Sequence, residues 1–259
     1  MNNPVQTSER VILCMKWGSK YGPEYVNRLY CMVRRHLKGE FRFVCLTDDD
    51  HGVRDEVQCL PIPDLALPEG LPERGWKKLV ALERHLHGLR GTALFLDLDI
   101  LIVDDIKPFF DLPGLFLIIH DWKRPLRITG NSSVYRFELG AHFDVLENFR
   151  TEHVRVRSKF RNEQAYLSEM LHRDDKLYYW PKKWCCSFKY HCIPKWPTNY
   201  WREPAFPSGT RIVVFHGEIN PPDALEGRRN RRFRSIKPAL WVAEHWTEQS
   251  SCRVDWTTT

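Results

Sequence analysis

Two carboxylates interrupt a long apolar stretch of this 259-residue chain. The stretch covers residues 93–103, and Asp97 and Asp99 stand in its middle with one leucine between them. Burying an ionised carboxylate costs several kcal/mol unless a partner compensates its charge. Side chains two positions apart in a strand point to the same side, so both carboxylates can reach one ligand. The pattern favours a hard divalent cation whose coordination is completed by phosphate oxygens. Two charges at the exposed end of a strand are the alternative.

The composition is that of an ordinary globular protein. Charged residues make up 28% and hydrophobic residues 42%, and one domain fits this length. The net charge of +6 favours an anionic partner, such as a nucleotide diphosphate, a nucleic acid or an anionic membrane. No run approaches the roughly 18 apolar residues of a membrane span, and residues 1–10 lack the apolar core of a secretory signal. We therefore expect a cytoplasmic protein.

The eight cysteines favour reduced thiols in a core. No Cys-x-x-Cys pair occurs, and Cys14 and Cys45 lie inside apolar runs. Cys185, Cys186 and Cys192 lie near His191, but their spacing fits no common structural zinc site.

Alternating apolar runs and amphipathic stretches predict a parallel α/β sheet. An apolar strand over residues 11–16 is followed by a helix that opens at Pro23 and ends at Gly39, and then by a strand over 41–46. This order predicts a right-handed crossover between parallel strands. Further helices are expected at 76–87, 162–172 and 236–246, further strands at 115–120, 134–137 and 211–215, a loop at 61–75, and irregular structure at 178–201.

Polar residues follow three of the predicted strands. In open α/β sheets, ligands bind beyond the carboxyl ends of the strands. Lys16 and Trp17 follow the first strand, the two aspartates interrupt the central one, and His216 follows the last one. A neutral imidazole can join two carboxylates around Mn²⁺ or a similar ion, although a histidine after a strand is also a common hydrogen-bonded structural residue.

The segment Phe-Leu-Asp97-Leu-Asp99-Ile, with a late His216-Gly217, resembles the Asp-x-Asp glycosyltransferases of the A-type fold. The similarity is to members related to glycosyltransferase family 8, the glycogenin-like and bacterial lipopolysaccharide-type sugar transferases. Matches in the same order extend over residues 11–222: Lys16-Trp17-Gly18-x-x-Tyr21-Gly22-Pro23, Trp76-Lys77-Lys78-Leu79, Asn131-Ser132-Ser133-Val134 and Glu163-Gln164. The resemblance implies a Rossmann-like, mixed but mainly parallel central sheet flanked by helices. It also implies one catalytic domain over 1–249, which leaves 250–259 as a polar tail.

The same resemblance implies a metal-dependent reaction that uses a nucleotide-sugar donor, in particular a UDP-sugar, and a saccharide or lipid-linked acceptor. Mn²⁺ or Mg²⁺ would be held by Asp97, Asp99 and His216. The donor would contact Lys16, Trp17, Tyr21, Lys78, Asp97 and Ser132. The residues beside the transferred sugar, which are the catalytic candidates, would be Asn131, Glu163 and Gln164. One departure from the family pattern is that no Lys-Pro-Trp follows His216-Gly217, so the lysine that would touch the diphosphate is missing there.

An arginine-rich run over Arg228–Arg234 can supply a replacement for that lysine. It can also be a solvated surface, or a peripheral contact with an anionic membrane on which a lipid-linked acceptor lies. The aromatic residues between 178 and 201 are equally open to two interpretations, an acceptor platform or rings that hold proline-rich loops to the core.

Two other functions fit parts of the pattern. A haloacid-dehalogenase-like phosphatase would use Asp97 as nucleophile and Asp174-Asp175 as its late acidic pair, but Asp97 arrives late in the chain for that class. A basic nucleic-acid-binding module would use the arginines and the aromatic residues. It leaves Asp97 and Asp99 unexplained, because carboxylates repel phosphates in the absence of a metal, so we expect no nucleic-acid partner.

Overall fold

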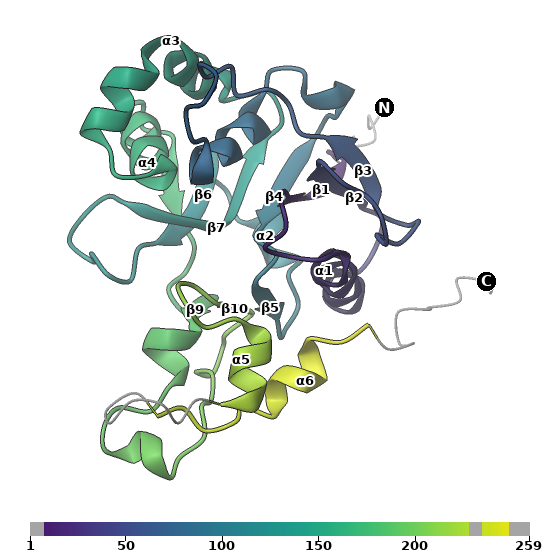
Figure 1. The fold of residues 1–259 in the computed structure, drawn as a ribbon, viewed down its shortest axis with the longest axis vertical. Helices are drawn as coiled ribbons and strands as arrows, with labels where there is room; N and C mark the ends of the chain where they lie inside the picture. The colour runs from purple at the N-terminus through teal and green to yellow at the C-terminus, as the bar shows by residue number, and fades with distance from the viewer. Residues whose placement is uncertain (1–7, 228–234, 249–259) are drawn as a thin grey trace, which may run out of the picture.

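The computed structural model describes residues 8–227 and 235–248, which form a large sheet and a small one (Figure 1). In the large sheet the strand order is β3-β2-β1-β4-β7-β6-β8. Only β7 runs against the others, since it is antiparallel to both β4 and β6. The predicted mixed, mainly parallel sheet is thus confirmed. Its strands are β1 Arg10–Lys16, β2 Arg42–Thr47, β3 Gln58–Pro61, β4 Thr92–Leu96, β6 Phe116–His120, β7 Gly130–Glu138 and β8 Leu177–Tyr179.

The predicted strand–helix–strand unit at the start of the chain is confirmed. Helix α1 (Pro23–His36) has Pro23 in its first turn and ends where the Leu37 amide donates to the Val33 carbonyl. It joins β1 to the parallel β2.

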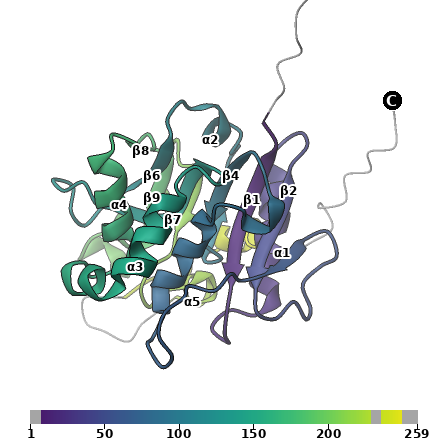
Figure 2. The ribbon, with the colours of Figure 1, turned by 90° about the horizontal axis from the view of Figure 1, so that it is seen from above.

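Alternate residues of β1 pack on opposite faces of the large sheet. Ile12 and Cys14 face a core that includes α1, the small sheet and the C-terminal helices. Leu13 and Met15 face a second core under residues 76–89 and the helices α3 (Phe143–Lys159) and α4 (Glu163–Arg173). Figure 2 shows α1 beside β1 and β2, with α3 and α4 beside β6, β7 and β8.

The small sheet changes the interpretation of residues 93–103. It consists of β5 (Ile100–Ile102), β10 (Ile212–Val214) and β9 (Cys185–Ser187), with β10 in the middle. The apolar stretch is therefore not one strand, because the chain leaves the large sheet at Leu96 and enters the small one at Ile100. Asp97 and Asp99 lie in the turn between the two sheets, and strand periodicity does not explain their proximity.

The segment predicted as a helix over 76–87 is instead two short 3₁₀ helices, η1 (Arg74–Leu82) and η2 (Leu86–Gly88). Extended backbone at Glu83 separates them, and His87 and Gly88 have positive φ angles, which a longer α-helix does not tolerate. The predicted burial of Leu79, Leu82 and Leu86 is confirmed.

Helix α4 confirms the prediction for residues 162–172, whereas the 17-residue α3 was not predicted. Other elements fall in the region expected to be irregular, namely β8, β9, the π-helical turn η3 (Phe188–Cys192) and η4 (Thr198–Tyr200). The short helices α2 (Pro108–Asp111) and α5 (Pro221–Glu226) were also not predicted, and the predicted closing helix is only α6 (Trp241–His245).

All seven cysteines within the described residues are free, and six of them are buried, as predicted for core thiols. No helix among the described residues is long and apolar enough to span a membrane. The arginine run 228–234 and the segment 250–259 lie outside the described residues. A single catalytic domain over 1–249 stays a prediction.

Candidate active site

The turn that carries Asp97 and Asp99 lies at the carboxyl edge of the large sheet, directly after β4. The Asp97 amide donates to the Ser133 carbonyl on β7 at 2.9 Å, which fixes the turn to the neighbouring strand. Both aspartates line one cavity of about 200 Å³. Its other walls come from the end of β1, the loop after it, η1 and the turn itself: Met15, Trp17, Lys20, Tyr21, Lys78 and Leu98.

Each carboxylate has a different partner. Lys78 Nζ lies 2.5 Å from Asp97 Oδ1, and the Tyr21 hydroxyl donates to Asp99 Oδ2 at 2.7 Å. Lys20, whose Nζ lies 4.4 Å from the centre of the Tyr21 ring, adds a second cation to the cavity. The cavity therefore holds two carboxylates and two ammonium groups at the edge where open α/β sheets bind ligands.

The electrostatics of the cavity depend on burial and on the two neighbouring carboxylates. Burial and then the negative charge of Asp97 raise the pKa of Asp99 to about 6. Burial by itself would lower the pKa of Lys78, but the charges of Asp97, Glu163 and Asp99 outweigh it and raise that pKa. Lys78 therefore stays protonated. A further cation between the carboxylates would relieve the repulsion by Asp97 that helps to raise the pKa of Asp99.

These two carboxylates fit a hard divalent cation for two reasons. Hard cations prefer oxygen ligands, and a cation would offset the repulsion between the two buried carboxylates. The predicted third ligand does not join them. His216 Nε2 lies 2.6 Å from Ser187 Oγ, within hydrogen-bond distance, and its ring stacks on Trp122 with centroids 5.9 Å apart. No group of three or more potential metal ligands gathers among residues 8–227 and 235–248.

The start of β7 and the start of α4 meet beside the turn. Asn162 caps α4 by accepting a hydrogen bond from the Ala165 amide, which sets Glu163 and Gln164 in the first turn. Glu163 Oε1 then accepts from Ser132 Oγ at 2.9 Å, and Gln164 Oε1 accepts from the Ser132 amide at 3.3 Å. The structure thus brings together Ser132, Glu163 and Gln164.

Asn131 precedes Ser132 on β7, and its side chain accepts from the Ser133 amide at 3.1 Å. The Ser133 carbonyl also accepts from the Asp97 amide. Asn131 and Ser132 are thus next to this contact along β7, and Glu163 and Gln164 are joined to it through Ser132.

Lys16 is not part of this cavity. Its buried Nζ donates to the Asp49 carbonyl at 2.8 Å and lies 3.8 Å from the Asp49 carboxylate. It therefore holds the loop after β2 rather than facing the aspartates. Trp17 and Tyr21, by contrast, do line the cavity.

Sequence reasoning missed a second cavity of about 240 Å³ at the same edge of the sheet. It lies at the carboxyl ends of β6 and β8. The residues in its lining that carry polar or aromatic groups are His120, Asp121, Trp122, Trp180, Lys182, Cys185 and His191. The available signal was the position of Asp121 and Trp122 directly after a predicted strand.

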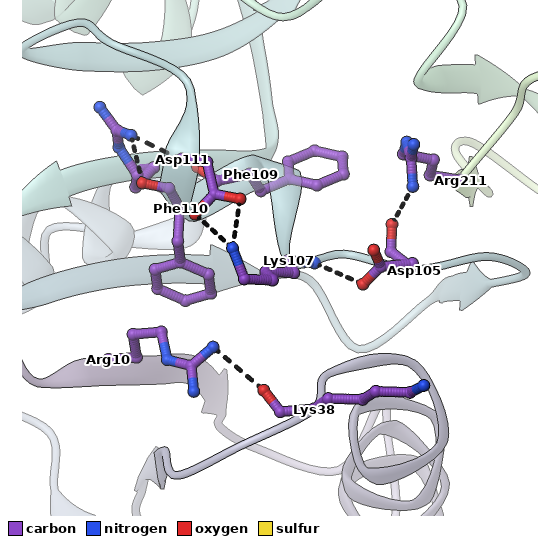
Figure 3. Close-up of polar contacts among 9 residues, drawn as sticks. Arg10, Lys38, Asp105, Lys107, Phe109, Phe110, Asp111 and Arg211 are labelled. Atoms are coloured by element: carbon purple, nitrogen blue, oxygen red, sulfur yellow. Dashed lines mark hydrogen bonds and ion pairs between the residues drawn. The ribbon is translucent and has the colours of Figure 1, made fainter.

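A further cavity, of about 820 Å³, lies at the opposite edge, near the first residues of β1, β2 and β4. Several of its charged groups are engaged with one another or with the backbone, as Figure 3 shows for two of them. Arg10 donates to the Lys38 carbonyl at 3.1 Å, and Lys107 Nζ lies 2.7 Å from the Asp111 carboxylate. We therefore assign the chemistry to the carboxyl edge.

No protein-family model and no curated protein sequence matches this chain. Several solved structures do. The galactosyltransferase LgtC, in complex with donor and acceptor sugar analogues, is 13% identical, with 82% of this chain and 88% of LgtC covered and a TM-score of 0.51. The fold is that of the A-type glycosyltransferases.

Two further glycosyltransferases of known structure support this assignment of the fold. The bifunctional WbbM is 11% identical, with 85% of this chain and 48% of WbbM covered and a TM-score of 0.53. GlyE from Streptococcus pneumoniae TIGR4 is 10% identical, with 82% of this chain and 56% of GlyE covered and a TM-score of 0.53.

The glycosyltransferase A-type fold disfavours the phosphatase hypothesis. Asp174 and Asp175 precede β8, which runs parallel to β4, so they lie at the edge of the sheet opposite to Asp97. Asp174 is instead paired with Lys176 at 2.9 Å. The late acidic pair that a phosphatase would need is not at the site.

Proposed function

We propose that this chain is a hexosyltransferase that moves a sugar from a UDP-sugar to a hydroxyl of a saccharide or lipid-linked acceptor. The observation that carries the proposal is the cavity in which Asp97 and Asp99 meet Lys78 and Tyr21, at the carboxyl edge of an A-type glycosyltransferase sheet. The binding of donor and acceptor analogues by LgtC, a protein of the same fold, supports a two-substrate reaction.

Asp97 and Asp99 would hold Mn²⁺ or Mg²⁺ together with oxygens of the donor diphosphate. When bound, the cation supplies positive charge where the leaving nucleoside diphosphate gains negative charge. We assign no metal contact to His216, because its Nε2 is engaged with Ser187. We also assign no donor contact to Lys16, because its ammonium is bound to Asp49.

The protein's own cations would also stabilise the negative charge of the leaving nucleoside diphosphate. As the bond between the anomeric carbon and the phosphate oxygen lengthens, negative charge grows on the diphosphate. Lys78 and Lys20, both in the cavity, can stabilise that charge more strongly in the transition state than in the ground state. Trp17 and Tyr21 offer aromatic faces to the uracil ring.

The residues at the starts of β7 and α4, namely Asn131, Glu163 and Gln164, would act on the transferred sugar. The anomeric carbon gains oxocarbenium character during transfer, as in glycoside hydrolysis. Glu163, which is mostly buried against Ser132, can stabilise positive charge on the sugar, while Gln164 and Asn131 can orient its hydroxyls.

A thermal-shift panel of nucleotides with and without Mn²⁺ tests this proposal. We expect UDP to raise the melting temperature only when the metal is present, because binding to the native state adds stability by mass action. The shift should disappear in Asp99→Ala and persist in Asp55→Ala, which changes an exposed carboxylate that does not line the cavity. Stabilisation by UDP that is the same in EDTA would overturn the metal–diphosphate assignment.

A cytoplasmic location stays a prediction. A peripheral contact with anionic membranes through Arg228–Arg234 also stays a prediction, because that run lies outside the described residues.

A further inference from the structure

The second cavity is connected to the first through two consecutive residues. The Phe215 amide donates to the Asp99 carbonyl at 3.1 Å, and the next residue, His216, stacks on Trp122 in the wall of the second cavity. Both cavities lie at the carboxyl edge of the same sheet, after β4 in one case and after β6 and β8 in the other. A molecule in the second cavity would therefore be a neighbour of the proposed donor.

Two tryptophans give this cavity rigid aromatic walls. Trp180 is buried, and its Nε1 donates to the Val134 carbonyl at 3.1 Å, which fixes the indole in one orientation. Trp122 is held between His216 and His191, with ring centroids 5.9 and 5.8 Å apart. Fixed aromatic faces suit the apolar C–H surfaces of a sugar ring.

The rim of the cavity carries positive charge that lacks acidic partners. Lys182 lines the cavity, Lys123 directly follows the lining residue Trp122, and Lys189 stands two residues before the lining residue His191. The charges of Lys123 and Lys189 also act on His216, whose pKa they lower, after burial, to about 4. None of these three lysines forms an ion pair within the described part of the chain.

One carboxylate, Asp121, lies in the wall, but its Oδ1 accepts a hydrogen bond from the Lys123 amide at 3.0 Å. It lowers the positive charge of the rim without removing it. Other exposed cations of the described chain do have acidic partners, such as Lys107 with Asp111 and Arg155 with Glu152. Unpaired ammonium groups around an aromatic cavity indicate a ligand that brings its own negative charge.

We propose that the second cavity is the acceptor site and that it selects a saccharide carrying an anionic group, a phosphate or a carboxylate. The sugar ring would lie against Trp122, and the anionic group would lie near Lys182 and Lys123. That the cavity holds the acceptor rests on the proposed function. The selectivity of the cavity for anionic sugars can be measured without the transfer reaction.

The experiment compares the affinities of four small probes by NMR titration of the tryptophan indole signals, in the presence of UDP and Mn²⁺. The probes are methyl glucoside, glucose 6-phosphate, glucuronic acid and inorganic phosphate. We expect glucose 6-phosphate and glucuronic acid to bind at least about tenfold more tightly than methyl glucoside, and inorganic phosphate to bind weakly. The two acidic sugars distinguish a phosphate from a carboxylate as the preferred group.

The double variant Lys123→Gln/Lys182→Gln should reduce the preference for acidic sugars to less than about threefold, since each rim charge contributes modestly. Lys183→Gln is the matched control, because Lys183 is also exposed and follows Lys182 in the chain but, unlike Lys182, does not line the cavity. Equal binding of neutral and acidic sugars would overturn the proposal. So would inorganic phosphate binding as tightly as glucose 6-phosphate, or the same loss in the control.

A separate measurement distinguishes this inference from the proposed function. The thermal shift by UDP and Mn²⁺ should be the same in the double variant and in the wild type, because neither lysine lines the donor cavity. If UDP fails to bind even the wild type, the transferase proposal is wrong, whereas the preference for acidic sugars is decided by the same titrations without UDP.

Discussion

Lys78 Nζ lies 2.5 Å from Asp97 Oδ1, and only 15% and 19% of the two side chains are exposed. The pair joins η1, which packs on one face of the large sheet, to the turn that leads into the small sheet. A buried ion pair contributes little net stability, but removal of one partner leaves an uncompensated charge. Here that charge would be a carboxylate beside a second carboxylate, so Lys78 balances the site before any donor is bound.

Replacing Lys78 by Gln should lower the free energy of unfolding by about 2 kcal/mol in urea at pH 7, because Asp97 loses its buried partner. The same variant should bind Mn²⁺ more tightly, since the competing ammonium is gone. Equilibrium unfolding and a Mn²⁺ titration followed by electron paramagnetic resonance measure the two effects. Lys77→Gln is the control. Its pair with Glu73 at 2.7 Å lies outside the cavity, and we expect a loss below about 1 kcal/mol. Equal effects of the two variants would contradict this role of Lys78.

The raised pKa of Asp99 predicts a pH dependence of stability. The pKa is about 6 in the folded protein and near 3.8 for an ordinary aspartate, so the folded state retains a proton that the unfolded chain releases between about pH 4 and 6. Stability therefore decreases as the pH rises through this window. In EDTA, Asp99→Asn should match the wild type below pH 4 and exceed its free energy of unfolding by on the order of 2 kcal/mol at pH 7. Asp55→Asn should show no such difference. A constant gap across the pH range would refute the titration of Asp99.

Removing the Tyr21 hydroxyl should raise the pKa of Asp99 further, because that hydroxyl donates to the ionised carboxylate at 2.7 Å and lowers its pKa. Tyr21→Phe should shift the ¹³C NMR titration of the Asp99 carboxyl to higher pH. It should also raise the pH at which UDP binding with Mn²⁺ becomes half-maximal. Tyr30 packs on Phe43 and does not line the cavity, so Tyr30→Phe should leave the titration of Asp99 unchanged if the Tyr21 hydrogen bond is the cause.

Gln164→Ala should slow turnover about 100-fold while the affinity for UDP changes little, because the side chain lies at the start of β7 rather than in the donor cavity. The helix should remain folded, since Asn162 still caps it. Steady-state kinetics and a UDP titration separate the two effects, with Glu169→Gln on the same helix as control. A parallel loss of turnover and UDP affinity would make Gln164 a structural residue.

The sequence predicted those parts of the fold that depend on neighbours in the chain. The unit β1–α1–β2 and the helix α4 follow from apolar periodicity, with Pro23 marking the start of α1. Helix α3 was missed because only four of its 17 residues are buried, which leaves a weak apolar stripe, and because its backbone departs from helical geometry at Glu152.

The residue types at the site were also readable, since two aspartates inside an apolar run need a partner wherever the run lies. Their arrangement was not. Asp97 and Asp99 meet because the chain changes sheets between them, and that change depends on β5 pairing with β10, more than 100 residues later in the chain. The same long-range pairing places His216 against Trp122 and Ser187 rather than beside the aspartates. Local sequence thus determined which groups are available, and contacts between distant segments decided which of them share a cavity.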